Sequence, residues 1–405
     1  MCYNENCFRA GEAAGHTSRL RGAENSRKRR KRLLKTLLAF ARRNTVMLVA
    51  LLAAAVTSCI VPPDAAYLGY FDFKTLTCLF CVLAVVCALR NISFFYSMAR
   101  KIVECFRNTR MCVLALVYIT FIGSMLIAND MALLTFLPLG YYVLNETGKR
   151  KYMAFTFVMQ NIAANLGGML TPFGNPQNLY LYTKFEIPTL EFMRIMAPPF
   201  LISIAIITVC CLFVRPEPLR LEGAPVNLPA GRTALYLALF ALAIGIVFRG
   251  IPYWIGLLVI PAVLFFADRD ALRSVDYPLL FTFVFFFIFA GNMGRIGLVR
   301  EFLSGLLEQN TLLVSVLSCQ LISNVPSAIL LSQFTNNYPE LLVGVNIGGV
   351  GTLVASLASL ITFREYVKAS PGKTAYYLGV FSVFNFGFLF LLTFLEEAFS
   401  LFRIA

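Results

Sequence analysis

Charged residues and histidine are scarce in this chain of 405 residues. Charged side chains make up 14% of it, against roughly 25% in soluble domains, and the one histidine, His16, lies in a basic tail. This excludes HExxH zinc sites, Ser-His-Asp triads and histidine relays. The nucleotide-binding patterns GxxxxGK[ST] and GxGxxG are also absent. We therefore expect neither a cofactor nor enzymatic activity, and a membrane-embedded enzyme remains only as an alternative from another class.

Cysteine is plentiful but gives no metal signature. Most of the eleven cysteines lie in apolar runs, where cysteine behaves as a small hydrophobic residue. Cys78 and Cys81 have CxxC spacing, but neither a second pair nor a histidine completes a zinc site. No metal centre is predicted.

Long apolar runs dominate the sequence, which is 59% hydrophobic. A helix that spans a bilayer needs about 20 such residues, and the runs predict an all-α polytopic membrane protein with about 9–11 spans. Full spans are expected near residues 46–62, 74–89, 152–182, 195–214, 233–249, 251–267, 279–298, 341–362 and 375–395.

Positive charge gathers before the first span. Residues 1–45 hold twelve Lys/Arg and three acids, which is +9 of the formal net charge of +14. Basic flanks stay on the cytoplasmic side and attract anionic lipid, so we expect lipid rather than nucleic acid as the partner of this extension. The same rule predicts a cytoplasmic N-terminus, a cytoplasmic linker at 215–232, and an inner (plasma) membrane location.

Two apolar stretches, 111–144 and 311–337, contain a polar interruption, at Asn129-Asp130 and at Ser323-Asn324. As one helix the first would be about 50 Å long, which exceeds the roughly 30 Å hydrocarbon core. Basic residues flank it on both sides, so it crosses the membrane an even number of times or not at all. We predict a re-entrant hairpin there and a second of opposite orientation at 311–337, as inverted repeats require.

The two halves also share a sequence window. NLGGMLTPFGNPQNL (Asn165–Leu179) aligns without gaps with NIGGVGTLVASLASL (Asn346–Leu360), and five positions are identical. Each window follows a hairpin, which predicts inverted repeats over 46–214 and 233–405. Glycine and proline interrupt a helix, so broken helices are expected at about 152–182 and 341–362.

Hairpin tips and broken helices together predict a central binding site. Unwound backbone at membrane depth is tolerated only where protein or a water-filled cavity receives its polar groups. Freed N–H groups and positive helix ends suit an anion, and freed carbonyls suit Na⁺. Candidate substrate contacts are therefore Asn129 and Asn324 at the tips, and Asn175, Gln177 and Asn178 beyond the first break.

Each of these candidates has a purely structural alternative. The tip asparagines are ordinary helix caps, and the other amides suit helix–helix hydrogen bonds. Asp130, an intramembrane carboxylate, either takes part in cation or proton coupling or sits ionised on the N-terminus of the following helix.

Three motifs resemble those of the ion transporter superfamily, in particular citrate-transporter-like and divalent-anion/sodium symporter permeases. They are IANDMALLTFLP (Ile127–Pro138), TPFGNPQNLYLY (Thr171–Tyr182) and SNVPSAILLS (Ser323–Ser332). The resemblance implies a homodimer whose transport part moves like an elevator against a scaffold. It also implies that each tip and its paired break bind a coupling Na⁺, or replace it by H⁺, with the anion between them.

Carried over residue by residue, the resemblance implies two sets of positions in this chain. The substrate-binding set is Asn129, Asn175, Gln177, Asn178, Asn324, Ser356 and Ser359. The cation-coupling set is Ala128, Asn129, Asp130, Gly174, Ser323, Asn324 and Ala355. The dicarboxylate symporters resemble Ser-Asn-Thr at both tips, whereas this chain has Ala-Asn-Asp and Ser-Asn-Val.

The leading hypothesis is secondary active transport of a small anion, above all a di- or tricarboxylate, coupled to Na⁺ or H⁺. Efflux of arsenite or another oxyanion, and sodium/proton antiport, are alternatives within the same class. A passive channel is a further alternative, although mirrored hairpins have no obvious use in an open pore.

Overall fold

The computed structural model describes residues 44–219 and 228–404. Nearly all of the predicted basic extension 1–45, and residues 220–227 of the predicted linker, lie outside the described residues. The described ranges are helical, and their one β feature is an isolated bridge between Asn108 and Pro218.

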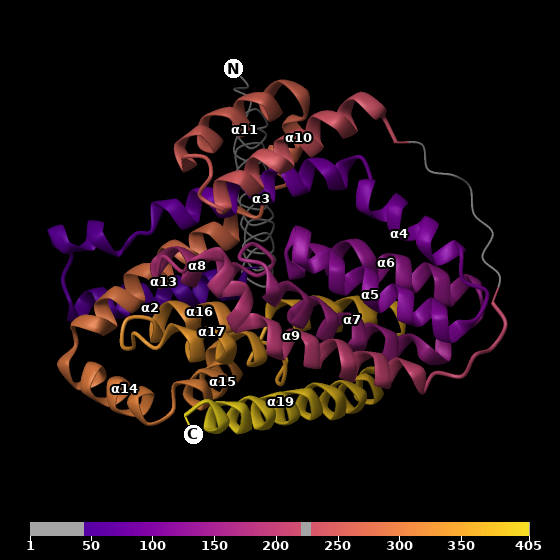
Figure 1. The fold of residues 1–405 in the computed structure, drawn as a ribbon. Helices are drawn as coiled ribbons and strands as arrows, with labels where there is room; N and C mark the ends of the chain where they lie inside the picture. The colour runs from indigo at the N-terminus through magenta and orange to yellow at the C-terminus, as the bar shows by residue number, and fades with distance from the viewer. Residues whose placement is uncertain (1–43, 220–227, 405) are drawn as a thin grey trace, which may run out of the picture.

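Figure 1 shows the arrangement of the helices. Their bounds are α2 Thr45–Ile60, η1 Ala65–Tyr70, α3 Phe73–Asn91, α4 Phe94–Glu104, α5 Thr109–Ile127, α6 Asn129–Glu146, η2 Arg150–Tyr152, α7 Met153–Gly167, η3 Gly168–Leu170, α8 Pro176–Lys184, α9 Thr189–Leu212, α10 Ala230–Val247, α11 Tyr253–Ala267, α12 Arg269–Arg273, α13 Tyr277–Arg295, α14 Gly297–Gln309, α15 Thr311–Ile322, α16 Asn324–Leu331, α17 Tyr338–Ile347, α18 Leu357–Ala369 and α19 Thr374–Ile404.

Six of the described helices are long and apolar enough to cross a membrane: α3, α5, α9, α10, α13 and α19. The predicted class, an all-α multi-pass membrane protein, is confirmed. Helices α2, α11 and α15 are apolar but shorter. The 15 residues of α11 extend over about 22 Å, less than the roughly 30 Å hydrocarbon core. The count of 9–11 spans therefore stays a prediction.

The sequence analysis did not separate the short helices α4 and α14, which come directly before the two interrupted stretches. Helix α4 is amphipathic, with Ala99 and Val103 buried and Met98 and Ile102 exposed. The amphipathic pattern of such short helices is hidden in a chain where almost every neighbouring segment is apolar.

Each interrupted stretch consists of two helices joined by a single non-helical residue. Ala128 separates α5 from α6, and Ser323 separates α15 from α16. The two helices of each pair also pack on one another. The membrane face from which each hairpin enters stays a prediction.

Each broken helix stops and resumes at the shared sequence window. Residues 171–175, here called the first break, separate η3 from α8, and residues 348–356, the second break, separate α17 from α18. Helix α5 packs along α7 and α15 along α17, whereas α6 contacts α18 and α16 contacts α8. Each hairpin therefore packs on the broken helices of both halves. In Figure 1, α10 and α11 lie with α3 at one end of the molecule, and α19 runs along the opposite edge.

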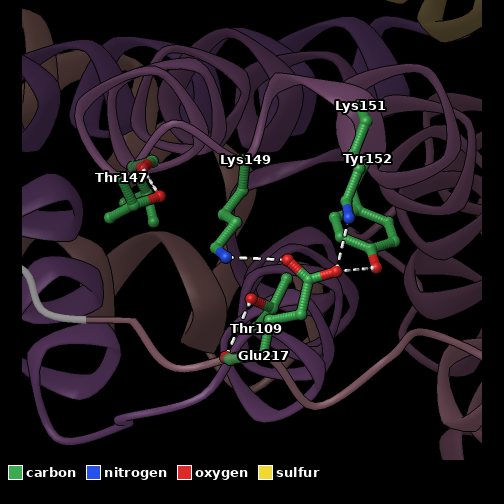
Figure 2. A network of polar contacts seen from close by, with 7 residues as sticks. Thr109, Thr147, Lys149, Lys151, Tyr152 and Glu217 are labelled. Atoms are coloured by element: carbon green, nitrogen blue, oxygen red, sulfur yellow. Dashed lines mark hydrogen bonds and ion pairs between the residues drawn. The ribbon is translucent and has the colours of Figure 1, made fainter.

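The segment after α9 is fastened to the base of the first hairpin through Glu217 (Figure 2). The backbone carbonyl of Glu217 accepts hydrogen bonds from the Thr109 amide at 2.9 Å and the Thr109 hydroxyl at 3.1 Å. Its carboxylate accepts from Lys149 Nζ at 2.7 Å, from Lys151, and from the Tyr152 hydroxyl at 2.9 Å. One residue thus ties together the start of α5, the end of the hairpin and the start of α7.

These donors decide how the Glu217 contact depends on pH. The hydrogen bonds from Lys149, Lys151 and Tyr152 lower the pKa of Glu217 from 4.5 to about 2. A group whose pKa is lowered by folding stabilises the fold above its unfolded pKa, and that contribution is lost as pH falls toward the folded pKa. We therefore expect Glu217→Gln to speed proteolysis at residues 215–219 in detergent at pH 7, with the difference from wild type disappearing between about pH 4.5 and pH 2.

The matched control is Glu146→Gln, because exposed Glu146 accepts only a 3.3 Å hydrogen bond from Asn145 among the contacts described. Equal proteolysis of wild type and Glu217→Gln at pH 7 would contradict the fastening role.

Candidate functional site

The two hairpin tips share an unusual backbone conformation. Ala128 has φ 66° and ψ 151°, and Ser323 has φ 76° and ψ 159°. This region is close to one that is almost restricted to glycine, and a residue held in such a region costs of order 1–3 kcal/mol. A residue other than glycine keeps this conformation only where its surroundings hold it. Each tip is therefore constrained, and its backbone geometry is the same in both halves.

The surroundings that hold each tip are the breaks. The Asn129 amide donates to the Gly174 carbonyl at 3.1 Å, and the Asn324 amide donates to the Ala355 carbonyl at 3.0 Å. Each asparagine Oδ1 also accepts a hydrogen bond of 2.9 Å from the amide that follows it, at Asp130 and at Val325. A freed backbone donor at the tip thus satisfies a freed acceptor in the break, as buried backbone groups require.

A second pair of equivalent bonds joins each break to the first helix of its hairpin. The Thr171 hydroxyl donates to the Met125 carbonyl at 2.7 Å, and the Thr352 hydroxyl donates to the Gln320 carbonyl at 3.1 Å. Thr171 and Thr352 are among the identical positions of the shared window. The repeated sequence therefore makes repeated contacts.

Asn165 and Asn346, also identical in the window, connect the two halves. Asn165 Oδ1 accepts from Asn129 Nδ2 at 3.2 Å and from the Ser356 hydroxyl at 2.8 Å. Asn346 Oδ1 accepts in turn from Asn175 Nδ2 at 3.0 Å and from Gln177 Nε2 at 3.3 Å. Each half thus provides one amide oxygen that accepts at least one hydrogen bond from the other half.

Different side chains donate to further backbone carbonyls in and next to the two breaks. Asn178 Nδ2 donates to the carbonyls of Gly168, Met169 and Thr171 at 3.1–3.3 Å. In the second half Gln320 Nε2 donates to the carbonyls of Gly348 and Val350 at 2.9 and 3.1 Å, and its Oε1 accepts from the Thr352 amide. One amide side chain near each break thus serves as a partner for unwound backbone, and the two come from different helices.

A cavity of about 540 Å³, here called the central cavity, is bounded by both tips, α8, α18, α2 and α13. The predicted site residues on its wall are Asn129, Asp130, Gln177, Ser323, Asn324 and Ser356. The other predicted site residues are buried but are not on its wall: Ala128, Gly174, Asn175, Asn178, Ala355 and Ser359. The structure therefore brings all of these residues together around the cavity, in a wall and a layer behind it.

The layer behind the wall is held by hydrogen bonds between amides and hydroxyls. Asn346 Nδ2 donates to Asn178 Oδ1 at 2.6 Å, and Asn161 Nδ2 donates to the Ser359 hydroxyl at 3.2 Å and to Asn385 Oδ1 at 3.3 Å. Asn178 and Ser359 thus make the hydrogen bonds between helices that their purely structural interpretation predicts. A direct role of either residue in substrate binding stays a prediction.

Unpaired acceptors face the same region. Within the described residues, Asp130 Oδ1, Asn175 Oδ1 and Gln177 Oε1 are buried and have no hydrogen-bond partner. Buried polar groups are normally paired. Asp130 and Gln177 belong to the cavity wall, so their unpaired oxygens are available to a ligand there, and such oxygens suit a cation or a proton-bearing group. The N-termini of α6 and α18 meet there with positive partial charge, which suits an anion.

Three kinds of residue around this site were not predicted from the sequence. Arg364 lines the cavity from α18. Asn161 and Asn385 are completely buried, and Phe286 and Phe289 of α13 form part of the cavity wall. An asparagine inside an apolar run is a signal that could have identified Asn161 and Asn385. Two phenylalanines in such a run carry no comparable signal.

Apolar spanning helices around a polar site made from two helix breaks are typical of a membrane transport protein. The chain belongs to the citrate transporter family, whose model matches residues 36–342, which confirms the superfamily resemblance. An uncharacterised transporter of Methanocaldococcus jannaschii is 31% identical over 72% of this chain and 81% of its own length. The inner membrane protein YbiR of Escherichia coli is 28% identical over 72% of this chain and 80% of its own length. A silicon efflux transporter of Oryza sativa subsp. japonica is 27% identical over 43% of this chain and 35% of its own length.

Close packing of the broken helices on the hairpins generates a stability prediction. A Cβ on Gly167 would lie 2.2 Å from the Phe121 carbonyl oxygen, and one on Gly348 would lie 2.8 Å from Cys319. A backbone carbonyl cannot give way easily, so Gly167→Ala should lower stability by about 1–3 kcal/mol, the usual cost of overpacking. The measurement is the Tm of purified protein in detergent.

The control is Gly379→Ala on α19, where nothing lies within 4 Å of the added Cβ. Alanine is a better helix former than glycine, so this control should keep or slightly raise the Tm. A Tm of Gly167→Ala equal to that of wild type would contradict the close approach.

Proposed function

We propose that this protein is a secondary active transporter of a small organic anion, coupled to Na⁺ or H⁺. Di- and tricarboxylates are the substrates that the family's name suggests. The observation that carries the proposal is the matched pair of tip-to-break hydrogen bonds, Asn129 to Gly174 and Asn324 to Ala355, on two sides of one cavity. The family match and the relatives described as transporters support the same class.

The chemistry of the site divides naturally between anion and cation. The helix N-termini at the cavity wall attract an anion, while the unpaired oxygens of Asp130 and Gln177 suit a cation or proton. A bound cation also reduces the cost of placing an anion in a low-dielectric site, because opposite buried charges compensate one another. This arrangement supports coupled binding of the two ions.

The proposal includes the architecture expected for such a carrier. The halves 46–214 and 233–405 form inverted repeats, their hairpins enter from opposite membrane faces, and the unit carrying the tips moves like an elevator in a homodimer. The protein lies in the inner (plasma) membrane with a cytoplasmic N-terminus. The repeated backbone geometry at Ala128 and Ser323 supports the two-fold relation of the halves.

A second candidate is efflux of a small oxyacid, such as arsenite or silicic acid. The tips Ala-Asn-Asp and Ser-Asn-Val lack hydroxyl groups at some positions where dicarboxylate symporters resemble Ser-Asn-Thr, which leaves fewer donors for two carboxylates. One relative is described as a silicon efflux transporter. Counterflow measurements with arsenite, silicic acid, citrate and succinate in proteoliposomes distinguish the candidates.

The tip asparagines give the first functional prediction. Asn129→Ala and Asn324→Ala each remove a cavity-facing amide and the cap on the next backbone amide, so each should lower the initial uptake rate at least about tenfold, the effect of losing roughly 1.4 kcal/mol. Uptake is measured in proteoliposomes at equal protein incorporation. Asn337→Ala, at an exposed position before α17, serves as the control, and full transport in both tip variants would refute the proposed site.

Asp130 gives the second functional prediction. Because Asp130 is the one acidic residue on the described cavity wall, Asp130→Asn removes a negative charge that a cation or proton would neutralise. We expect the dependence of uptake on Na⁺ concentration or pH to change more than the relative rates for different anions. If the Na⁺ and pH profiles of Asp130→Asn match those of wild type, Asp130 is not a coupling residue.

A further inference from the structure

The central cavity has one wall that is apolar and aromatic. Leu279, Phe286 and Phe289 of α13 line it on one side. The second hairpin adds Ile322, Val325 and Leu330, and α18 adds Leu357 and Leu360. A compact anion with a carboxylate at each end has no use for such a wall, since carboxylates facing it would lose hydration without gaining hydrogen bonds.

The charges on the described cavity wall are few and opposite: Asp130 is the one acidic residue and Arg364 the one basic residue. No ion pair or hydrogen bond occupies the Arg364 side chain within the described part of the chain. Its guanidinium is therefore free to bind a carboxylate through two parallel hydrogen bonds. A single Arg matches one carboxylate and leaves the second and third carboxylates of a tricarboxylate without a cationic partner.

Arg364 lies on the face of α18 that forms the cavity wall. Leu357, Leu360 and Arg364 are spaced by three and four residues, which places them on one side of a helix, and all three line the cavity. The rise from Leu357 to Arg364 is about 10 Å, and helical side chains slant toward the N-terminus. Arg364, which is exposed, thus lies on the cavity wall about two helical turns beyond the second break.

From this arrangement we propose that the substrate is an aromatic or branched aliphatic monocarboxylate. Its carboxylate binds Arg364, and its hydrocarbon body lies against Phe286, Phe289 and Leu360. The inference rests on the proposed transport function and narrows its substrate away from di- and tricarboxylates. The cavity volume of about 540 Å³ lies within the range of small-molecule sites, whose lining is usually apolar with a few placed polar groups.

This substrate class also explains why cation and anion would travel together. With Asp130 ionised, the empty cavity holds one negative and one positive side chain. A monocarboxylate alone would leave the site with a net charge of −1, and a cation or proton on Asp130 restores neutrality. Moving net charge through a low-dielectric interior is costly, so the empty and the fully loaded sites move more readily than the half-loaded ones. One cation per monocarboxylate is the expected ratio.

The test compares phenylacetate with citrate in proteoliposomes that hold wild type, Arg364→Ala, Arg364→Lys or Lys368→Ala. Lys368 is a matched control, because it lies one turn further along α18, pairs with Glu365 and is absent from the central cavity. For wild type we expect a KM for phenylacetate at least about tenfold below that for citrate. Loss of a charge-assisted hydrogen bond predicts at least about a tenfold rise in the phenylacetate KM in Arg364→Ala. Arg364→Lys should recover part of this loss, and Lys368→Ala should leave the KM unchanged.

A separate measurement keeps the result interpretable if a variant folds poorly. The Tm of each purified variant without ligand reports folding, and the rise in Tm with phenylacetate reports binding by mass action. A lower KM for citrate than for phenylacetate, or an unchanged phenylacetate KM in folded Arg364→Ala, overturns this inference but leaves anion transport standing. Absence of carboxylate uptake by folded wild type overturns both the inference and the proposed function.

Discussion

The structure depends on one constraint: a helix that stops inside a membrane must provide partners for the backbone groups that it frees. Water is not there to accept them, and each unsatisfied group costs several kcal/mol. This chain meets the constraint by pairing its interruptions, so that the amide at each hairpin tip donates to a carbonyl in a break. The strained residues Ala128 and Ser323 are held by that pairing. Tips and breaks must therefore meet, and the place where they meet is rich in buried polar groups.

That polar region has two layers with different tasks. Behind the cavity wall, the side-chain amides of Asn165, Asn346 and Asn178 donate hydrogen bonds to one another or to backbone carbonyls. On the wall, Asp130 and Gln177 keep an oxygen without a partner. A hydrogen-bonded inner layer positions the few groups that remain available to a ligand, which is how binding sites are usually supported. The asymmetry between the tips then decides the chemistry, because Asp130 follows one asparagine and Val325 follows the other.

The interruptions could be predicted from sequence because polar residues, glycine and proline are conspicuous in apolar runs. Asn129-Asp130 and Ser323-Asn324 marked the points where α5 and α15 end. The Gly-Gly pair marked both breaks, and prolines marked the first one as well. The direction in which each amide points could not be predicted, since an almost uniformly apolar helix has no amphipathic pattern to orient it. Asn175 and Asn178 were therefore predicted as substrate contacts together with Gln177, although of the three only Gln177 lies on the wall of the central cavity. Arg364 was not predicted as a site residue for a related reason: nothing in the sequence shows that its face of α18 borders the cavity.

The amide oxygen of Asn165 has a consequence for how ligand binding at the two tips is related. It accepts hydrogen bonds both from Asn129, at the first tip, and from Ser356, in the second break. A ligand that attracts either donor weakens that donor's bond to Asn165 and leaves the oxygen freer for the other, so the energies of the two tips are not independent. If ligands bind at both tips, binding at one would change the affinity at the other, and the coupling would be reciprocal by thermodynamic necessity. The two half-sites would then act as one cooperative unit, and the saturation curve would depart from a hyperbola.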